Sequence, residues 1–180
     1  MANKALVYAI YPDEKQNIQC QKTFGCCRFV YNHMLALQQD RYKNGEKHLN
    51  KKNANNYCNQ HFKEDYPFLK EVDKFALTNA IYHLEDGYDR FFKHLSKFPK
   101  FKSKHKAKKS YTTNFTNGNI EIGENFIKLP KLGAVKAKVH RKPEAGWKIK
   151  SATVTQNRDG SYQVSVLFAF EKTIPNAAAT

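Results

Sequence analysis

Two kinds of sequence meet in residues 73–109, DKFALTNAIYHLEDGYDRFFKHLSKFPKFKSKHKAKK. In the first part, apolar residues keep a helical spacing over several turns, at Leu77, Ile81, Leu84, Tyr88, Phe91 and Leu95. Asp73 stands before this run and is a suitable N-cap, so a helix is predicted to begin there. After the lysine-rich second part, the apolar residues alternate instead, as they do in strands. The stretch therefore separates a helical region from a region of strands and predicts an α+β protein.

The region after residue 109 is predicted to contain six strands, separated by turns rich in Asn, Gly and Pro. Their expected bounds are 111–116, 119–122, 125–129, 134–140, 147–156 and 161–170. At the other end of the chain, the β-branched and aromatic run of residues 2–11 predicts a further strand, which Pro12 ends. That strand has no neighbour of its own kind in the sequence. We therefore expect it to pair with the C-terminal strands and to close an antiparallel β-barrel.

The residues between the first strand and the basic stretch predict a helical insertion in this barrel. An amphipathic helix is expected from Asp13 to Thr23, where Phe24-Gly25 breaks the pattern, and a second helix from Cys26 to about Asn44. A shorter helix is expected near residues 54–64.

A helix that follows a short turn resembles a helix-turn-helix, whose second helix enters a major groove. Its polar face here carries Arg28, Asn32, Gln38 and Gln39. An ordinary helical hairpin explains the same pattern equally well.

The charge balance points to a polyanionic partner. The 31 Lys and Arg residues exceed the 16 Asp and Glu residues, which gives a formal net charge of +15. Such a charge opposes compaction unless a polyanion neutralises it, and nucleic acid is the commonest one. A membrane partner is not expected, because the sequence has no basic amphipathic helix, lipidation signal or apolar run of roughly 18 residues. The first residues also lack the pattern of a signal peptide, so a cytoplasmic protein with reduced cysteines is expected.

A basic arm, residues 97–109, is the strongest candidate for binding the phosphate backbone. It contains no acidic residue, and Phe98 and Phe101 lie among its lysines, so the arm suits both phosphates and bases. A solvated loop is the alternative, and Phe98 followed by Pro99 can instead anchor the arm to the core. Basic residues elsewhere join the candidate set because they can project from a helix or follow a strand. The full set is Arg28, Lys97, Lys100, Lys102, Lys104, Lys106, Lys108, Lys109, Arg141 and Lys142.

No catalytic or metal-binding residues are expected in this sequence. The acidic pairs Glu64-Asp65 and Glu85-Asp86 are adjacent on helices and point apart, so they do not form the carboxylate cluster that metal-dependent phosphodiester cleavage needs. Cys58 and His61 have a spacing that suits one helical face, with Cys20, Cys26 and Cys27 upstream. A zinc site usually draws on paired knuckles, however, and buried structural thiols explain the four cysteines better.

Six blocks in this sequence, in order, resemble the N-terminal half of TnpB proteins, which are transposon-encoded relatives of type V CRISPR effectors. The blocks are KALVYAIYP (4–12), TFGCCRFVYNH (23–33), EVDKFALTNA (71–80), FPKFKSK (98–104), SYTTNFTN (110–117) and IKLPKLG (127–133).

The resemblance implies a division of the chain into parts. A wedge domain would form the β-barrel from residues 1–11 and 110–172, the helical recognition domain would span 12–96, the basic arm 97–109 and a tail 173–180. In the family this half grips a guide RNA and reads a short transposon-adjacent DNA motif, and a RuvC nuclease domain with a zinc knuckle follows. The chain ends at Thr180, before that nuclease would begin.

Guide RNA and target DNA are therefore the expected partners, together with a separate nuclease domain. No cleavage and no cofactor are expected of these residues, and divalent metal and zinc are expected only in the nuclease. A guide-independent DNA-binding regulator with a helix-turn-helix remains the alternative.

By analogy with the family, motif reading falls to Lys74 and Thr78 at the start of the long helix and to Thr116 and Asn117 in the first hairpin. Thr78 stands where glutamine is usual in the family. Because a shorter side chain there cannot fork onto adenine, the preferred motif is expected to differ.

Overall fold

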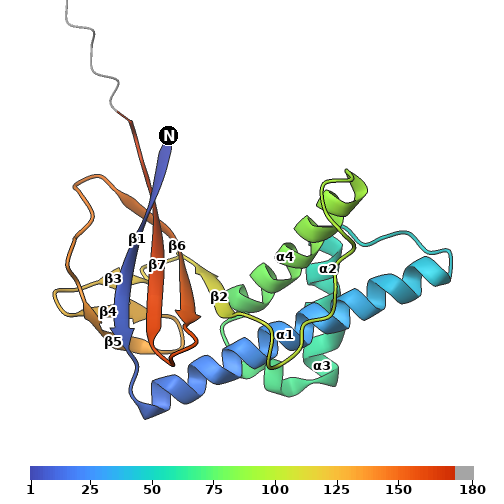
Figure 1. The fold of residues 1–180 in the computed structure, drawn as a ribbon, viewed down its shortest axis with the longest axis horizontal. Helices are drawn as coiled ribbons and strands as arrows, with labels where there is room; N and C mark the ends of the chain where they lie inside the picture. The colour runs from blue at the N-terminus through green and yellow to red at the C-terminus, as the bar shows by residue number, and fades with distance from the viewer. Residues whose placement is uncertain (173–180) are drawn as a thin grey trace, which may run out of the picture.

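The computed structural model describes residues 1–172 and confirms an α+β fold (Figure 1). The helical part lies between the first strand and the other six. Its elements are α1 (Glu14–Lys43), α2 (Lys51–Tyr57), the π-helical turn η1 (Cys58–Phe62), α3 (Lys63–Asp65), the 3-10 turn η2 (Pro67–Glu71) and α4 (Lys74–Phe92). The strands are β1 (Ala2–Tyr11), β2 (Lys109–Asn114), β3 (Glu121–Ile122), β4 (Phe126–Leu129), β5 (Gly133–Lys138), β6 (Lys148–Gln156) and β7 (Tyr162–Phe170). The predicted tail, residues 173–180, lies outside the described residues.

The first strand pairs with the C-terminal strands, as predicted. β1 runs antiparallel to β7, from Ala2 opposite Phe170 to Ile10 opposite Tyr162. On its other side it pairs with β5, where Ala9 lies opposite Lys138. Alternate residues of β1 and β7 are buried, which gives the sheet one apolar face. The strand farthest from the others in sequence is therefore at the centre of the sheet.

The predicted closure into a barrel is wrong. The seven strands form an open antiparallel sheet in the order β2-β6-β7-β1-β5-β4-β3, with β2 and β3 at its two edges. β3 holds only two residues, so it offers little backbone for pairing. The side-chain amide of Asn79 in α4 donates a hydrogen bond of 2.8 Å to the carbonyl of Thr112 in β2. The helices thus contact β2 where barrel closure would require another strand.

The predicted break at Phe24-Gly25 is also wrong, because α1 is one continuous helix of 30 residues. Asp13 caps its N-terminus and accepts a hydrogen bond of 2.8 Å from the backbone of Gln16. Phe24 is buried and its ring packs 5.6 Å from Tyr111 and 6.4 Å from Tyr162. This packing against the sheet outweighs the helix propensity that Gly25 loses, about 1 kcal/mol.

The predicted start of α4 is confirmed. Asp73 caps the helix, and its side chain accepts a hydrogen bond of 3.3 Å from the backbone of Phe75. The apolar face packs into the core through Leu77, Ile81, Leu84 and Tyr88, all of which are buried. The helix ends at Phe92, however, and Leu95 is 73% exposed beyond it. None of the helices among residues 1–172 has the length and apolarity to cross a membrane.

Candidate nucleic-acid interface

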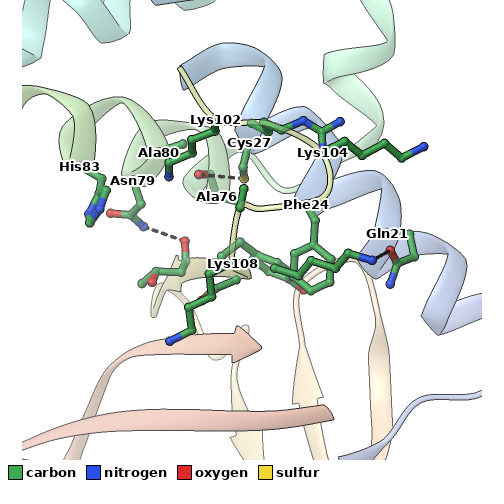
Figure 2. Close-up of a pocket in the computed structure, with 17 residues that line it drawn as sticks. Gln21, Phe24, Cys27, Ala76, Asn79, Ala80, His83, Lys102, Lys104 and Lys108 are labelled. Atoms are coloured by element: carbon green, nitrogen blue, oxygen red, sulfur yellow. Dashed lines mark hydrogen bonds between the residues drawn. The ribbon is translucent and has the colours of Figure 1, made fainter. Parts of the chain in front are cut away.

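A groove lies between α1, α4, the basic arm and β2, and Figure 2 shows the side chains that line it. One wall is the helical surface around Gly25 and Asn79, and the other is formed by the second half of the arm and the start of β2. An added Cβ on Gly25 would meet no atom within 4 Å, so the missing side chain leaves this wall open. The basic residues that line the groove are Arg28, His83, Lys102, Lys104, Lys108 and Lys109.

The charge of this groove has one sign. Among the described residues that line it, none is Asp or Glu. Lys104, Lys108 and Lys109 are exposed, so their ammonium groups are accessible to a polyanion. The pKa of His83 is lowered by loss of solvent around its ring and then by the nearby charges of Lys102 and Arg90. The groove therefore concentrates positive potential where helices and sheet meet.

Lys102 differs from the other arm lysines. Its side chain reaches into the groove, and its Nζ lies 4.3 Å from the centroid of the Tyr31 ring, in a cation-π contact. Loss of solvent around this ammonium lowers its pKa below the ordinary lysine value. The residue thus attaches the arm to α1 as well as contributing charge.

The arm is held in place by hydrogen bonds rather than lying free. The side-chain amide of Asn32 in α1 donates to the carbonyl of Lys102 at 2.9 Å and accepts from its backbone N–H at 2.8 Å. Farther along, Lys109 Nζ donates to Gln21 Oε1 at 3.4 Å. Phe98 anchors the start of the arm, because its ring packs edge-on 5.5 Å from Tyr88. The anchoring alternative for Phe98 is therefore confirmed, while Phe101 is 53% exposed.

A second basic hollow lies on the other side of the arm, against the β6–β7 turn. It is lined by arm residues that include Lys106 and by Arg158 in the turn. Arg158 does not stand out in the sequence, since its neighbour Asp159 carries the opposite charge. In the structure Asp159 accepts hydrogen bonds from the backbone and hydroxyl of Ser161, at 2.9 Å and 2.6 Å. These hydrogen bonds engage the carboxylate within the turn, and Arg158 lines the same hollow as the arm residues.

Some of the predicted backbone-binding residues lie outside the groove. Arg141 and Lys142 belong to the loop between β5 and β6. Figure 1 shows this loop on the side of the sheet away from the helices. Lys142 is paired with Glu124, at 2.8 Å between Nζ and Oε1. Lys97 and Lys100 are exposed at the start of the arm, but they do not line the groove.

The four predicted motif-reading residues come from two elements that contact each other. Lys74 is exposed at the start of α4, and Thr78 lies one turn later with its hydroxyl donating to Asn55 Oδ1 at 3.1 Å. Thr116 and Asn117 are exposed in the turn after β2, where Asn117 adopts a positive φ of 49°. The hydrogen bond from Asn79 to Thr112 joins α4 to β2 between these two pairs.

Contacts within the chain engage part of the predicted DNA-facing surface of a second helix. Gln38 is 2% exposed, and its amide donates to the carbonyl of Leu49 at 2.9 Å and to Glu85 Oε1 at 3.0 Å. The side-chain amide of Asn32 is engaged in its two hydrogen bonds with the backbone of Lys102. Two of the four polar residues therefore hold other segments of the chain, because tertiary contacts cover the part of α1 that the sequence suggested was open.

The prediction of buried structural thiols is confirmed. Cys20, Cys26, Cys27 and Cys58 are all buried and free of disulfides. Burial raises the pKa of Cys27 to about 12, and the pKa of each of the other three to about 11. The spacing of Cys58 and His61 does not place them on one face, since the π-helical turn buries Cys58 and exposes His61. Among residues 1–172, no three His, Cys, Asp or Glu side chains gather as a metal-binding group.

Comparison with known proteins finds a family match and several relatives. Residues 1–47 match a family described as a helix-turn-helix domain, of the OrfB type. A Streptomyces pristinaespiralis protein named as an RNA-guided DNA endonuclease is 30% identical over 98% of the chain, and InsQ of Escherichia coli (strain K12), named likewise, is 26% identical over 96%. The chain spans only 44% and 42% of these two relatives.

A third relative is shorter. The virulence protein VsdF of Salmonella dublin is 29% identical over 57% of the chain, and the match covers 94% of VsdF. The OrfB-type match begins at β1 and covers α1, and the two endonuclease relatives match nearly the whole chain. Together these matches support an N-terminal TnpB-type sequence, whose first 47 residues carry the OrfB-type helix-turn-helix match.

Proposed function

We propose that this chain grips a guide RNA and a target DNA for a TnpB-type system, and that it does not cleave nucleic acid by itself. In this proposal residues 1–11 and 110–172 act as the wedge, residues 12–96 act as the recognition part, and the arm binds the phosphate backbone between them. Lys74, Thr78, Thr116 and Asn117 read the short DNA motif.

The groove between α1, α4 and β2 is the observation that carries the proposal. It is lined by six basic residues that three separate segments of the chain supply. The arm that provides four of them is fixed by Asn32 and Phe98, so its charges have a defined position before any ligand arrives. Preorganised ammonium groups lose less conformational entropy on binding. This favours specific binding of one ligand over nonspecific attraction to polyanions. Two relatives named as RNA-guided endonucleases support RNA and DNA as the ligands.

The placement of the carboxylates supports a binding role rather than a cleaving one. Glu46 pairs with Arg41 at 2.8 Å, Glu85 pairs with His48 at 2.7 Å, and Asp73 caps α4. These acidic groups stabilise the fold at separate positions. Phosphodiester cleavage by a two-metal mechanism needs carboxylates within reach of ions about 4 Å apart.

The deciding experiment identifies the nucleic acid that copurifies with the chain. After a high-salt wash, the bound material is extracted and sequenced, and we expect one defined RNA from the neighbourhood of the transposon end. The recovered complex should then bind duplex DNA carrying the cognate motif. Footprinting of duplex DNA without any RNA would instead show a guide-independent regulator. Metal-dependent cutting that follows the protein through repurification would refute the absence of cleavage.

A further inference from the structure

A second surface stands out at the end of the helices remote from the sheet. A hollow there is lined by Tyr88 and by Tyr42, Phe91, Phe92 and Phe98, and we call the last four the aromatic patch. Tyr42 is 86% exposed, Phe92 56% and Phe98 41%. Exposed rings gathered in one hollow usually mark a binding surface, because burying them against a partner is favourable. The patch lies outside the groove that the proposed function uses.

The rings of the patch form a connected array. Phe91 packs 5.7 Å from Phe92 and 5.2 Å from Phe98, between ring centroids. Phe92 also packs edge-on against His48 at 5.7 Å. These contacts hold the rings of Phe91, Phe92 and Phe98 together in one array. Tyr42, on the last turn of α1, lines the same hollow.

The charges around the patch favour nucleic acid over protein. Lys43, which follows Tyr42, lines the hollow, and Lys93 and Lys97 are exposed beside Phe92 and Phe98 in the chain. Glu46 also lines the hollow, but Arg41 neutralises it at 2.8 Å. The cores of protein interfaces are depleted in lysine, whereas surfaces for single strands combine rings that stack on bases with ammonium groups for the phosphates.

The basic arm connects the patch to the groove. Phe98 belongs to the patch, and Lys102 reaches into the groove four residues later. Four residues of extended chain span at most roughly 14 Å. An RNA strand that leaves the groove along the arm is therefore within reach of the aromatic rings, and residues 98–102 of the arm contain no acidic residue.

We propose that the aromatic patch binds unpaired bases of a single-stranded RNA by stacking. The inference rests on the proposed function, since the same RNA occupies the groove, but it concerns a different surface and a different type of contact. The groove binds phosphates, so its contribution depends on salt. The patch binds bases, so its contribution requires the bases themselves.

The test compares two single-stranded RNAs of about 16 nucleotides, the upper end of ordinary single-strand site sizes. One is a uridine strand, and the other has the same phosphates but no bases. The full chain should bind the strand with bases more tightly. Changing Tyr42→Ala and Phe92→Ala together should weaken binding of this strand roughly 5- to 100-fold and leave the abasic strand unaffected.

Matched variants separate the two surfaces. The pair Tyr42→Phe and Phe92→Tyr keeps both rings and should keep the preference for bases. The pair Lys104→Ala and Lys108→Ala in the groove should weaken both strands alike and lower their salt dependence, with the preference for bases retained. Because Tyr42 is 86% exposed, Tyr42→Ala alone provides a folded variant if the double change destabilises the chain.

Each other outcome counts against the inference. If the full chain binds both strands equally, the patch does not stack on bases, while phosphate binding by the groove still stands. If it binds neither strand, the proposed function fails as well. If the double alanine variant keeps the preference for bases but changes the sedimentation of the chain, the patch is a protein contact and the inference is wrong.

Discussion

The side chain of Asn32 forms two hydrogen bonds with the backbone of Lys102, donating to its carbonyl at 2.9 Å and accepting from its N–H at 2.8 Å. The two residues are 70 positions apart in the chain. An amide that donates and accepts at once imitates a neighbouring strand, so it satisfies both backbone groups of a segment that has no sheet partner. This contact explains how a lysine-rich arm without regular structure keeps a fixed place against α1.

Changing Asn32→Ala should release the arm. Two hydrogen bonds are lost, each with a net contribution of about 0.5 to 1.5 kcal/mol, so the open arm should become roughly 5- to 100-fold more populated. Trypsin cleaves after lysine, and cleavage within residues 97–109 should accelerate by a similar factor while opening is rapid. Gln39→Ala, a change elsewhere on α1, is the matched control. Equal cleavage rates for the two variants would show that Asn32 does not hold the arm.

The arm lysines should account for much of the salt dependence of binding. Lys104, Lys106 and Lys108 are exposed, and changing all three to Ala should reduce the log-log salt slope on duplex DNA by up to about 2.7, since each phosphate contact contributes about 0.9. The measurement is affinity against salt concentration. The control triple, Lys15→Ala, Lys47→Ala and Lys52→Ala, removes the same charge from exposed positions elsewhere.

A result in which both triples lower the slope equally would mean that net charge alone, rather than the placed arm, attracts the DNA. An unchanged slope in the arm triple would leave the arm without a role in binding.

The strands were predictable because period-two alternation and turn residues are local signals. The strand expected at 161–170 is β7 (Tyr162–Phe170), and that expected at 147–156 is β6 (Lys148–Gln156). The antiparallel partner of β1 also followed, from the lack of any nearby strand. Whether the sheet closes could not be predicted from the sequence. Closure depends on whether a helix or a strand covers β2, and no local pattern specifies that contact.

The site was predictable only in its charges. The lysines of the arm lie close together in the sequence and could be recognised, but Arg158 lines the hollow beside the arm from a distant turn. The expected break in α1 failed for a related reason. Gly25 is a helix-weakening residue in any local reading, and the contacts of Phe24 with Tyr111 and Tyr162 that outweigh it are long-range.

Gly25→Ala should stabilise the chain by about 0.5 to 1 kcal/mol, the helix-interior difference between the two residues. Gly25 has no positive φ, and a Cβ there meets nothing within 4 Å, so the change introduces no strain. Gly118→Ala is a control with the opposite expected result. Gly118 has a φ of +69°, which is unfavourable for alanine, so this change should lower stability. Urea unfolding measures both. Destabilisation by Gly25→Ala would indicate that α1 turns at this position after all.

The buried thiols should make stability fall in alkaline solution. Their pKa values are raised from 9.0 to about 11 or 12, so the unfolded chain releases these protons at lower pH than the folded one. The contribution of the protonated thiols to stability is therefore fully present below about pH 9. It is lost as the pH rises through the thiol pKa values of the folded chain. Urea midpoints at about pH 8 and about pH 10 test this, and Cys58→Ala should show a shallower decline. Equal declines in both proteins would assign the effect to other groups.

The contact between α4 and β2 fixes the start of α4 relative to the turn that follows β2. Lys74 follows the cap Asp73 at the start of α4, and the positive pole of that helix end favours a nearby phosphate. Asn117 follows β2 in a turn, with a side-chain amide that both donates and accepts, the combination that reads an adenine edge. Its φ of 49° is one that asparagine and glycine tolerate well, so Asn117→Gly removes the amide and keeps the turn.

Lys74→Ala and Asn117→Gly should each cost about 1 to 3 kcal/mol of binding on the preferred DNA motif and much less on a scrambled sequence, because base contacts carry the specificity. Affinities of the guide-loaded chain for the two duplexes measure the difference. Thr78→Gln supplies the longer side chain that can fork onto adenine, and it should change which motif is preferred. Equal losses on both duplexes would show that Lys74 and Asn117 only hold the backbone. No loss on either would leave both residues with purely structural roles in α4 and the turn.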